Sequence, residues 1–176
     1  MFEEIIFKLK QLFQIIEEKK ANDKLLFITV PKDQTVLLVQ FMREQLGYKH
    51  LVLLTAVDYI EDGNFQLTYL LNNPTTKNDI GVKTFISRDN ASMETAHHLW
   101  ETIATYQREL KEMFGIDFKG SPRVNEPFIL EGWDGIPPYR RDFDTKAFAD
   151  SFYHQRDSRQ TNDPATFMKN NLYPNE

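Results

Sequence analysis

The chain has 176 residues, of which 41% are hydrophobic and 13% aromatic, so it is long and apolar enough for one globular domain with a core, plus a tail. Its formal net charge of -5 disfavours a general nucleic-acid binder and leaves room only for a local basic patch. Because the chain has no cysteine, it cannot form disulfides, thiolate metal sites, cysteine-ligated iron–sulfur clusters or a cysteine nucleophile.

The N-terminus, MFEEIIFKLK, is acidic at its start and lacks the continuous apolar region of a signal peptide. No run of about 18 apolar residues occurs, which is the length that a membrane-spanning helix needs. We therefore expect a chain without a secretion signal or a spanning segment of its own, in a reducing compartment.

Hydrophobic spacing predicts the elements of the first half. Apolar residues recur at helical spacing over residues 2–16 and predict an amphipathic helix that ends near KKAND. KLLFITV then predicts a buried strand, which Pro31 stops. A second helix is expected from about Asp33 to Leu46, with Gly47 as its C-terminal cap.

Three strand candidates and a third helix follow. HLVLLTAVDY, FQLTYLL and IGVKTFIS are the candidate strands, and Asp62-Gly63 predicts a hairpin turn between the first two. A third helix is predicted from Ser92, a candidate N-cap, to Phe114, with Gly115 capping its end. Its apolar stripe consists of Ala96, Leu99, Trp100, Ile103, Tyr106, Leu110 and Met113.

The chain changes character after Gly115. Apolar residues alternate there with Gly and Pro, and from Thr145 on the sequence is polar with scattered aromatics. The order α-β-α-β-β-β-α predicts an α+β fold with two layers, a mixed β-sheet with helices on one face. We divide the chain into a core domain (1–118), an irregular docking segment (119–144) and an extended C-terminal tail (145–176).

The search for catalytic motifs finds none. His97 and His98 are neighbours on a helix, so their side chains diverge by about 100° and cannot easily share a metal. Neither Ser121 nor Ser151 lies in a G-x-S-x-G frame, and GIDFKG lacks the spacing of a phosphate-binding loop. We predict no catalytic, metal-binding or cofactor-binding residue.

Glu109 and Glu112 share a helix face, as a general acid–base pair would. Arg108 and Lys111 flank them, however, so a solvated or partner-facing charged surface is the favoured interpretation.

The docking segment has the composition of a protein interface, because large aromatics and arginines dominate binding hot spots. Its aromatic and arginine residues are Trp133, Tyr139, Phe143, Arg140 and Arg141. Pro137-Pro138 stiffens the segment and lowers the entropy lost on docking. A strap across the protein's own sheet is the alternative. The two interpretations are compatible; they have equal weight for Trp133, and partner contact is favoured for the arginines and the tail.

QRELKEMFGIDFKGSP, followed by FILEGWDGIPPYRRDFD, resembles the signature of the C-type, or thirty-kilodalton-type, subunit family of NADH–quinone oxidoreductase (respiratory complex I). That family's pattern is approximately E-R-E, two variable residues, Met-Phe-Gly-Ile, Phe-x-Gly-His-Pro, then Trp-x-Gly-x-Pro and Arg-Lys-Asp-Phe/Tyr. LLTAVDY, followed by FQLTYLL, is similar to the family's strand pair, so the resemblance covers most of the chain up to Phe143.

Three departures separate this chain from the pattern. Gln107 stands where the family usually has its first Glu, Ser121 replaces the His of Gly-His-Pro, and RVNEPFIL replaces a stretch with two arginines. Relatives in this family occur in membrane-bound hydrogenases and in ferredoxin-dependent or sulfur-reducing complexes. The variant motif leaves open which complex this chain serves and whether quinone is the acceptor.

The resemblance implies a non-catalytic, cofactor-free scaffold in the peripheral arm, on the cytoplasmic face of the cell membrane. It would lie beside a D-like large subunit and near B-like and other cluster-bearing subunits. Iron–sulfur clusters, and flavin or a nickel–iron site, are expected in those partners. The complex would carry electrons from NADH or ferredoxin to quinone. Alternatively, as a membrane-bound [NiFe] hydrogenase or sulfur-reducing complex, it would couple ferredoxin oxidation to ion translocation.

Composition and resemblance together predict a set of partner-binding residues: Arg108, Glu109, Glu112, Met113, Phe114, Gly115, Trp133, Gly135, Pro137, Arg140, Arg141, Asp142 and Phe143. The tail beyond Asp144 would wrap along a neighbouring protein of the complex. A stand-alone enzyme is a rival hypothesis without a supporting motif. A nucleic-acid module using YRRDF is a second rival, weakened by the net negative charge and by acids interleaved with the arginines.

Overall fold

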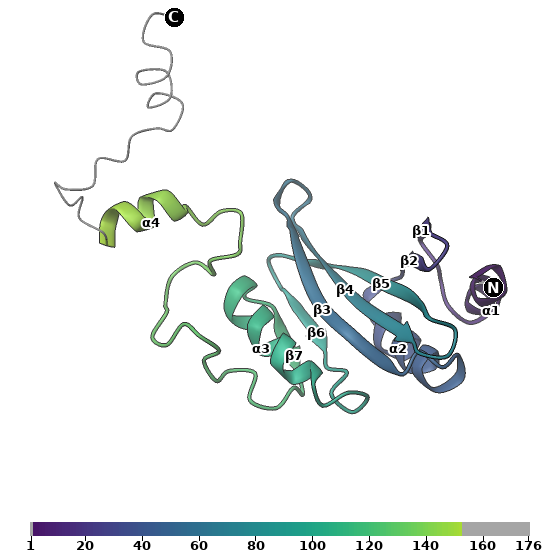
Figure 1. Ribbon diagram of the computed structural model, residues 1–176. Coiled ribbons are helices and arrows are strands. Elements are labelled where there is room, and N and C mark those ends of the chain that lie inside the picture. The colour runs from purple at the N-terminus through teal and green to yellow at the C-terminus, as the bar shows by residue number, and fades with distance from the viewer. Residues whose placement is uncertain (1, 153–176) are drawn as a thin grey trace, which may run out of the picture. The chain divides into compact units, whose positions relative to one another are not determined.

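The structure is a computed structural model that describes residues 2–152 (Figure 1). The chain divides into two units, residues 1–143 and 144–176. In the second unit, the structure describes Asp144 and helix α4 (Thr145–Phe152). Asp144 caps the first turn of this helix, since its Oδ1 accepts hydrogen bonds from the backbone N–H groups of Lys146 and Ala147. The rest of the predicted tail lies outside the described residues.

The centre of the first unit is a five-stranded mixed sheet, whose strands lie in the spatial order β1-β2-β5-β4-β3 (Figure 1). The strands are β1 (Glu17–Asn22), β2 (Leu25–Thr29), β3 (His50–Tyr59), β4 (Asn64–Asn73) and β5 (Asn78–Ser87). β2 and β5 pair in parallel, and the other neighbours pair antiparallel. The predicted α+β class with a mixed sheet is confirmed.

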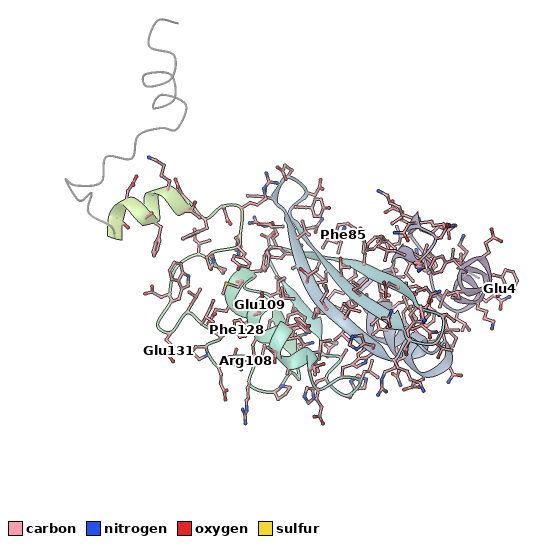
Figure 2. The ribbon with its side chains drawn as sticks, viewed as in Figure 1. Glu4, Phe85, Arg108, Glu109, Phe128 and Glu131 are labelled. Atoms are coloured by element: carbon pink, nitrogen blue, oxygen red, sulfur yellow. The ribbon has the colours of Figure 1, made fainter. Side chains whose placement is uncertain are left out.

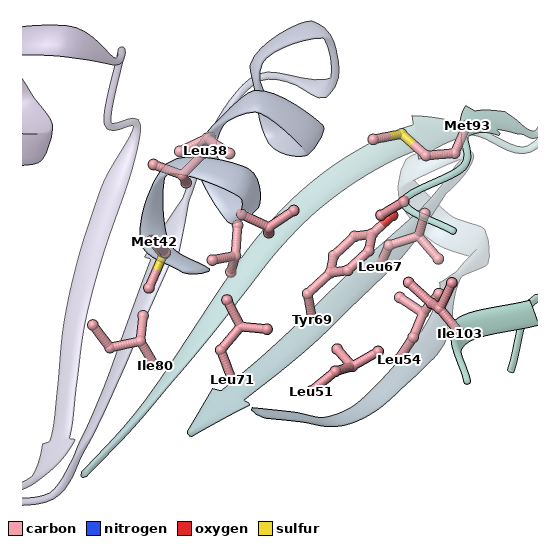
Figure 3. Packing of buried hydrophobic residues seen from close by; sticks show 14 of the residues in the cluster. Leu38, Met42, Leu51, Leu54, Leu67, Tyr69, Leu71, Ile80, Met93 and Ile103 are labelled. Carbon is pink, nitrogen blue, oxygen red and sulfur yellow. The ribbon is translucent and has the colours of Figure 1, made fainter. Parts of the chain in front are cut away.

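The core lies between one face of this sheet and the helices α1 (Phe2–Leu12), α2 (Lys32–Gln45) and α3 (Ile103–Phe114). Alternation along β4 points Leu67, Tyr69 and Leu71 to that face, where they are fully buried (Figure 3). Leu38 of α2 and Ile103 of α3 belong to the same cluster. The opposite face of the sheet carries exposed apolar residues, namely Val57, Tyr59 and Phe85.

Several sequence predictions are confirmed at the ends of elements. β3 has the bounds of HLVLLTAVDY, and a short 3₁₀ turn (η1, Ile60–Asp62) leads through Gly63 into β4. Gly47 and Gly115 follow α2 and α3 with φ of +78° and +79°. These left-handed values suit glycine, which has no Cβ to clash with the backbone carbonyl.

The prediction that the first helix continues to KKAND is wrong. α1 ends at Leu12, and Glu17–Asn22 is an edge strand whose residues are all exposed. Two tertiary hydrogen bonds explain the early end: the Gln14 N–H donates to Gln34 Oε1 of α2, and the Ile16 N–H donates to the Thr29 carbonyl of β2. Charged residues are typical of edge strands, and here they produce no apolar alternation in the sequence.

The prediction that the third helix begins at Ser92 is also wrong. Ser92–Glu94 is a strand, β6, which pairs in parallel with β7 (Asp117–Lys119), the strand that follows α3 in the chain. The residues between β6 and α3 form turns, although Ala96 and Leu99 are buried as their apolar spacing predicts. A strand partner located after the helix overrides the local helical spacing, so Ser92 caps no helix.

Candidate partner-docking interface

The docking segment (119–144) follows β7 and contains no helix or strand from residue 120 to residue 144. Its position depends on α3, whose charged residues face it (Figure 2). The segment can therefore be described through the bonds that hold it at three places: on the side of α3, at the end of α3, and at the end of the sheet.

Arg108 and Glu112 hold the segment on the side of α3. Arg108 donates to the Pro127 carbonyl at 2.6 Å through Nη2 and to the Glu126 carbonyl at 3.4 Å through Nε. The two carboxylate oxygens of Glu112 accept the backbone N–H groups of Phe128 and Ile129 at 2.7 and 2.9 Å. One turn of α3 thus satisfies donors and acceptors of a segment that has no ladder of its own.

The pKa of the Glu112 carboxyl is lowered from its ordinary value. Partial burial by itself raises this pKa, but the backbone hydrogen bonds from Ile129, Phe128 and Leu130, helped by the charge of Arg108, outweigh the burial. Glu112 is therefore a carboxylate committed to holding backbone groups. Glu109, by contrast, is half-buried, and its side chain makes no hydrogen bond or ion pair with the described residues.

The end of α3 meets the second half of the segment. The Tyr139 N–H donates to the carbonyl of the buried Met113 at 3.0 Å, and the Phe114 ring packs edge-on against Tyr139 with 5.7 Å between centroids. Gly115, whose φ is +79°, lies beside the same part of the segment, since a Cβ built on it would be in van der Waals contact with Pro137 Cγ at 3.4 Å. The Met-Phe-Gly sequence therefore supplies a carbonyl, a ring and a backbone without a side chain.

Trp133 belongs to a turn within the segment itself. Its indole N–H donates to the Ile136 carbonyl at 3.1 Å, and its ring packs edge-on against Phe143 at 5.7 Å. Gly135 lies under the indole, since a Cβ there would be 3.4 Å from the ring. These contacts give Trp133 an internal structural role, and whether its exposed surface also meets a partner stays a prediction.

A cavity of about 300 Å³ lies between α3 and this turn. The charged groups of α3 that line the cavity already have partners in the chain. Arg108 and Glu112 bind the segment, and Lys111 pairs with Asp117 at 2.8 Å. The remaining lining is largely apolar and includes Leu130 and Trp133. Three large apolar side chains of the same segment are solvent-exposed: Ile129 (66%), Ile136 (48%) and Tyr139 (56%).

Ion pairs hold the end of the segment against the end of the sheet. Arg140 binds Asp142 through Nε and Nη2 at 3.1 and 3.2 Å. Arg141 pairs with Glu61 at 2.5 Å, and both of these side chains are more than half exposed. Partial burial by itself raises the pKa of Asp142, but its hydrogen bonds and the charges of Arg140 and Arg88 outweigh this and lower it.

Asp58 and Arg88 also belong to this network, although they are not among the predicted partner-binding residues. Asp58 lies in LLTAVDY at a position that alternation directs to the core face, after Leu54 and Ala56. The sequence does carry one indication that Asp58 matters, because a carboxylate at a core-facing strand position needs a charged or hydrogen-bonding partner. Its partner, Arg88, comes directly after β5.

The described part of the chain contains no cluster of three or more His, Asp or Glu residues that could hold a metal. Within the same residues, no helix has both the length and the apolar character needed to cross a bilayer.

Comparison with known families decides the assignment. Residues 28–149 match the family described as the 30 Kd subunit of respiratory-chain NADH dehydrogenase. The chain belongs to this 30 Kd subunit family. The family membership that the MFGI and WDGIPPYRRDF motifs predicted is confirmed.

Relatives in the family are subunits of complex I-type complexes. The chain is 33% identical over 117 residues to the C subunit of NADH-quinone oxidoreductase from Citrifermentans bemidjiense, a match that covers 66% of this chain and 72% of the relative. It is 32% identical over 148 residues to the C/D subunit of NADH-quinone oxidoreductase from Hydrogenobaculum sp., a match that covers 83% of this chain and 25% of the relative.

A solved structure is also similar. A chain of the membrane-bound sulfane sulfur reductase, an archaeal respiratory membrane complex, superposes with a TM-score of 0.79 at 29% identity, covering 92% of this chain and 96% of that one. The predicted partner-binding residues up to Phe143 all lie on α3, just after it, or in the docking segment. Their contact with a partner stays a prediction.

Proposed function

We propose that this 30 Kd family chain is a cofactor-free docking subunit in the peripheral arm of a complex I-type membrane-bound oxidoreductase. One observation carries the proposal: internal bonds hold the docking segment against α3 while it exposes Ile129, Ile136 and Tyr139. A segment that is already ordered loses less entropy when it binds, and exposed apolar groups beside a cavity are typical of interfaces.

We propose a D-like large subunit as the main partner. The Hydrogenobaculum relative supports this choice, because it is named as a C/D subunit and the match to this chain occupies only 25% of it. When two subunits occur as one polypeptide, their surfaces meet at high effective concentration. B-like and other cluster-bearing subunits would lie nearby, and iron–sulfur clusters, with flavin or a nickel–iron site, would belong to these partners.

Two complexes are candidates for the whole assembly. The curated relatives, named as subunits of NADH-quinone oxidoreductase, favour electron transfer from NADH or ferredoxin to quinone. The structural similarity to the sulfane sulfur reductase favours a sulfur-reducing complex, or a related [NiFe] hydrogenase, that couples ferredoxin oxidation to ion translocation. In both cases the chain would act on the cytoplasmic face of the cell membrane and contact the membrane through its partners.

A reconstitution assay tests the docking role. Membranes from a strain of the native host that lacks this chain are titrated with purified chain, and the bound chain and the complex are measured. Ile129→Asp should weaken binding roughly tenfold, the effect of losing about 1.4 kcal/mol at an apolar contact. Phe7→Asp is the matched control, because Phe7 on α1 is also 66% exposed but lies outside the docking segment.

The result expected is weaker binding for Ile129→Asp alone, with unchanged melting temperatures for both variants. Equal binding of both variants would overturn the proposal that the docking segment is the interface. Metal and flavin analysis of the purified chain tests the cofactor-free role separately, and a stoichiometric cofactor would contradict it.

A further inference from the structure

Asp58 and Arg88 form a buried ion pair at the end of the sheet. Arg88 Nε lies 2.8 Å from Asp58 Oδ1, and Arg88 Nη2 lies 3.1 Å from Oδ2. The Asp58 side chain is only 2% exposed, and the Arg88 side chain 12%. One hydrogen bond, from Nη2 to Oδ2, joins the two groups, and the close approach of Nε to Oδ1 adds charge attraction.

This pair holds the end of the docking segment. The Arg141 N–H donates to Asp58 Oδ2 at 2.9 Å, although the two residues are 83 positions apart in the sequence. Arg88 Nη2 also reaches Asp142 Oδ1 at 3.0 Å. One core carboxylate and one guanidinium thus bind two successive residues of the segment.

The same contacts give the two neighbouring arginines different orientations. The Arg140 guanidinium binds Asp142 with two hydrogen bonds and lies 5.9 Å from the centroid of the buried Phe65 ring, so its side chain is only 24% exposed. The Arg141 side chain is 54% exposed, and among the described residues it forms its ion pair with Glu61, which is 64% exposed. An exposed ion pair of this kind contributes little to stability, so it can be exchanged for another carboxylate.

We propose that Asp58 and Arg88 are positioning residues for docking: they fix the end of the segment so that Arg141, and not Arg140, presents its guanidinium to a carboxylate on the partner. This inference rests on the proposed docking function. Asp58 binds the backbone of Arg141, which leaves the side chain free to face outward. Arg140 has the internal role of covering Phe65.

The first experiment replaces both residues of the Asp58–Arg88 ion pair, which we call the anchor of the docking segment. A single Arg88 variant would leave the buried Asp58 charge unpaired and risk unfolding, whereas Asp58→Leu combined with Arg88→Met removes both charges and the oxygens that accept the Arg141 N–H, and keeps similar side-chain shapes. Lys10→Met combined with Glu18→Gln is the control, because it removes a different ion pair, at 2.8 Å, made outside the segment. Hydrogen exchange of the Arg141 amide in the isolated chain is the primary measurement.

The Arg141 amide should exchange at least roughly tenfold faster in the anchor double variant, as expected when a hydrogen bond to a charged group is lost. Binding in the reconstitution assay should fall roughly threefold to tenfold, because the partner must then order the segment. The control variant should change neither value. Unchanged exchange in a folded anchor variant, or faster exchange with unchanged binding, would overturn the inference.

The second experiment separates the arginines. Arg141→Ala should weaken binding roughly tenfold with little change in melting temperature, and Arg140→Ala should lower the melting temperature with a smaller effect on binding. The opposite pattern would overturn the assignment. Normal binding of Ile129→Asp would overturn the docking function itself. The anchor can still be judged in that case, because the exchange of the Arg141 amide is measured in the isolated chain.

Discussion

Glu112 and Arg108 illustrate how single charged residues hold the docking segment in place. Both lie on one turn of α3, and both bind backbone groups of the docking segment and not each other. From the sequence, a charged helix face of this kind indicates a solvated surface or a partner-binding surface. The structure adds a third use of the charges, which is to satisfy a segment that has no regular hydrogen-bond ladder.

Replacement of Glu112 by Gln tests this use. Glutamine keeps one acceptor but places an amide N–H₂ group opposite a backbone N–H donor, so we expect a loss of about 1–2 kcal/mol in the free energy of unfolding at neutral pH. Because the folded-state pKa of Glu112 lies below its ordinary value of 4.5, its stabilisation is present above pH 4.5 and is lost as the pH falls through the folded-state pKa.

Thermal melts of the wild type and Glu112→Gln should therefore differ at neutral pH and converge in acid. Glu109→Gln is the control, since the Glu109 side chain makes no hydrogen bond or ion pair with the described residues and the loss of its charge should leave neutral-pH stability unchanged. A constant difference between wild type and Glu112→Gln across the acid range would show that the carboxylate charge does not act in this way.

At the scale of elements, the sequence predicted those whose signals are local. β3, β4 and β5 have alternating or continuous apolar residues, and the helix ends at Gly47 and Gly115 have glycines that tolerate positive φ. β1 could not be predicted from pattern, because its six residues are charged, polar or small and are all exposed on the sheet edge.

The start of α3 and the anchor of the docking segment could not be predicted for a different reason, which is distance along the chain. β6 is a strand because it pairs with β7, which follows α3. The role of Asp58 depends on Arg141, which is 83 residues away. The composition of the docking segment could predict its character, and the core-facing position of Asp58 indicated that this carboxylate needs a partner, but no single-sequence pattern could predict that its partner is this segment.

The junction between α3 and the docking segment offers a test at this scale. Gly115→Ala should destabilise the chain by about 1–2 kcal/mol, because a non-glycine residue is strained at a φ of +79°. A Cβ there would be in van der Waals contact with Pro137 Cγ, at 3.4 Å, so a backbone movement that relieves the strain would disturb the segment. Hydrogen exchange of the Tyr139 amide, which is bound to the Met113 carbonyl, should become faster.

Gly63→Ala is the control that shows the effect of backbone strain at a positive φ without a neighbouring segment to disturb. Gly63 has a φ of +64°, but nothing lies within 4 Å of a Cβ built there. Both variants should lose stability to a similar extent, while only Gly115→Ala should speed exchange at Tyr139 and weaken binding in reconstitution. If the two variants behave alike in exchange and binding, the glycine of Met-Phe-Gly serves the helix end alone.

At the scale of the whole molecule, the contacts described above that hold the docking segment are made within residues 1–143. Arg88, Arg108 and Glu112 of the core bind the segment, and the division between the two units comes directly after Phe143. The unit that contains the docking surface is therefore expected to fold without the second unit. The two units can then be assigned separate contributions by truncation.

A chain that ends after Asp144 provides the experiment. Its melting temperature should lie within about 2 °C of the full-length value, because in a chain of this size a lost contact of the first unit would lower it by about 2–4 °C per kcal/mol. In reconstitution, binding should become weaker if residues 145–176 follow a neighbouring protein of the complex as the sequence predicts, since a segment that orders on binding adds contact area. A large fall in melting temperature would instead show that the second unit stabilises the first, and unchanged binding would contradict a partner role for the tail.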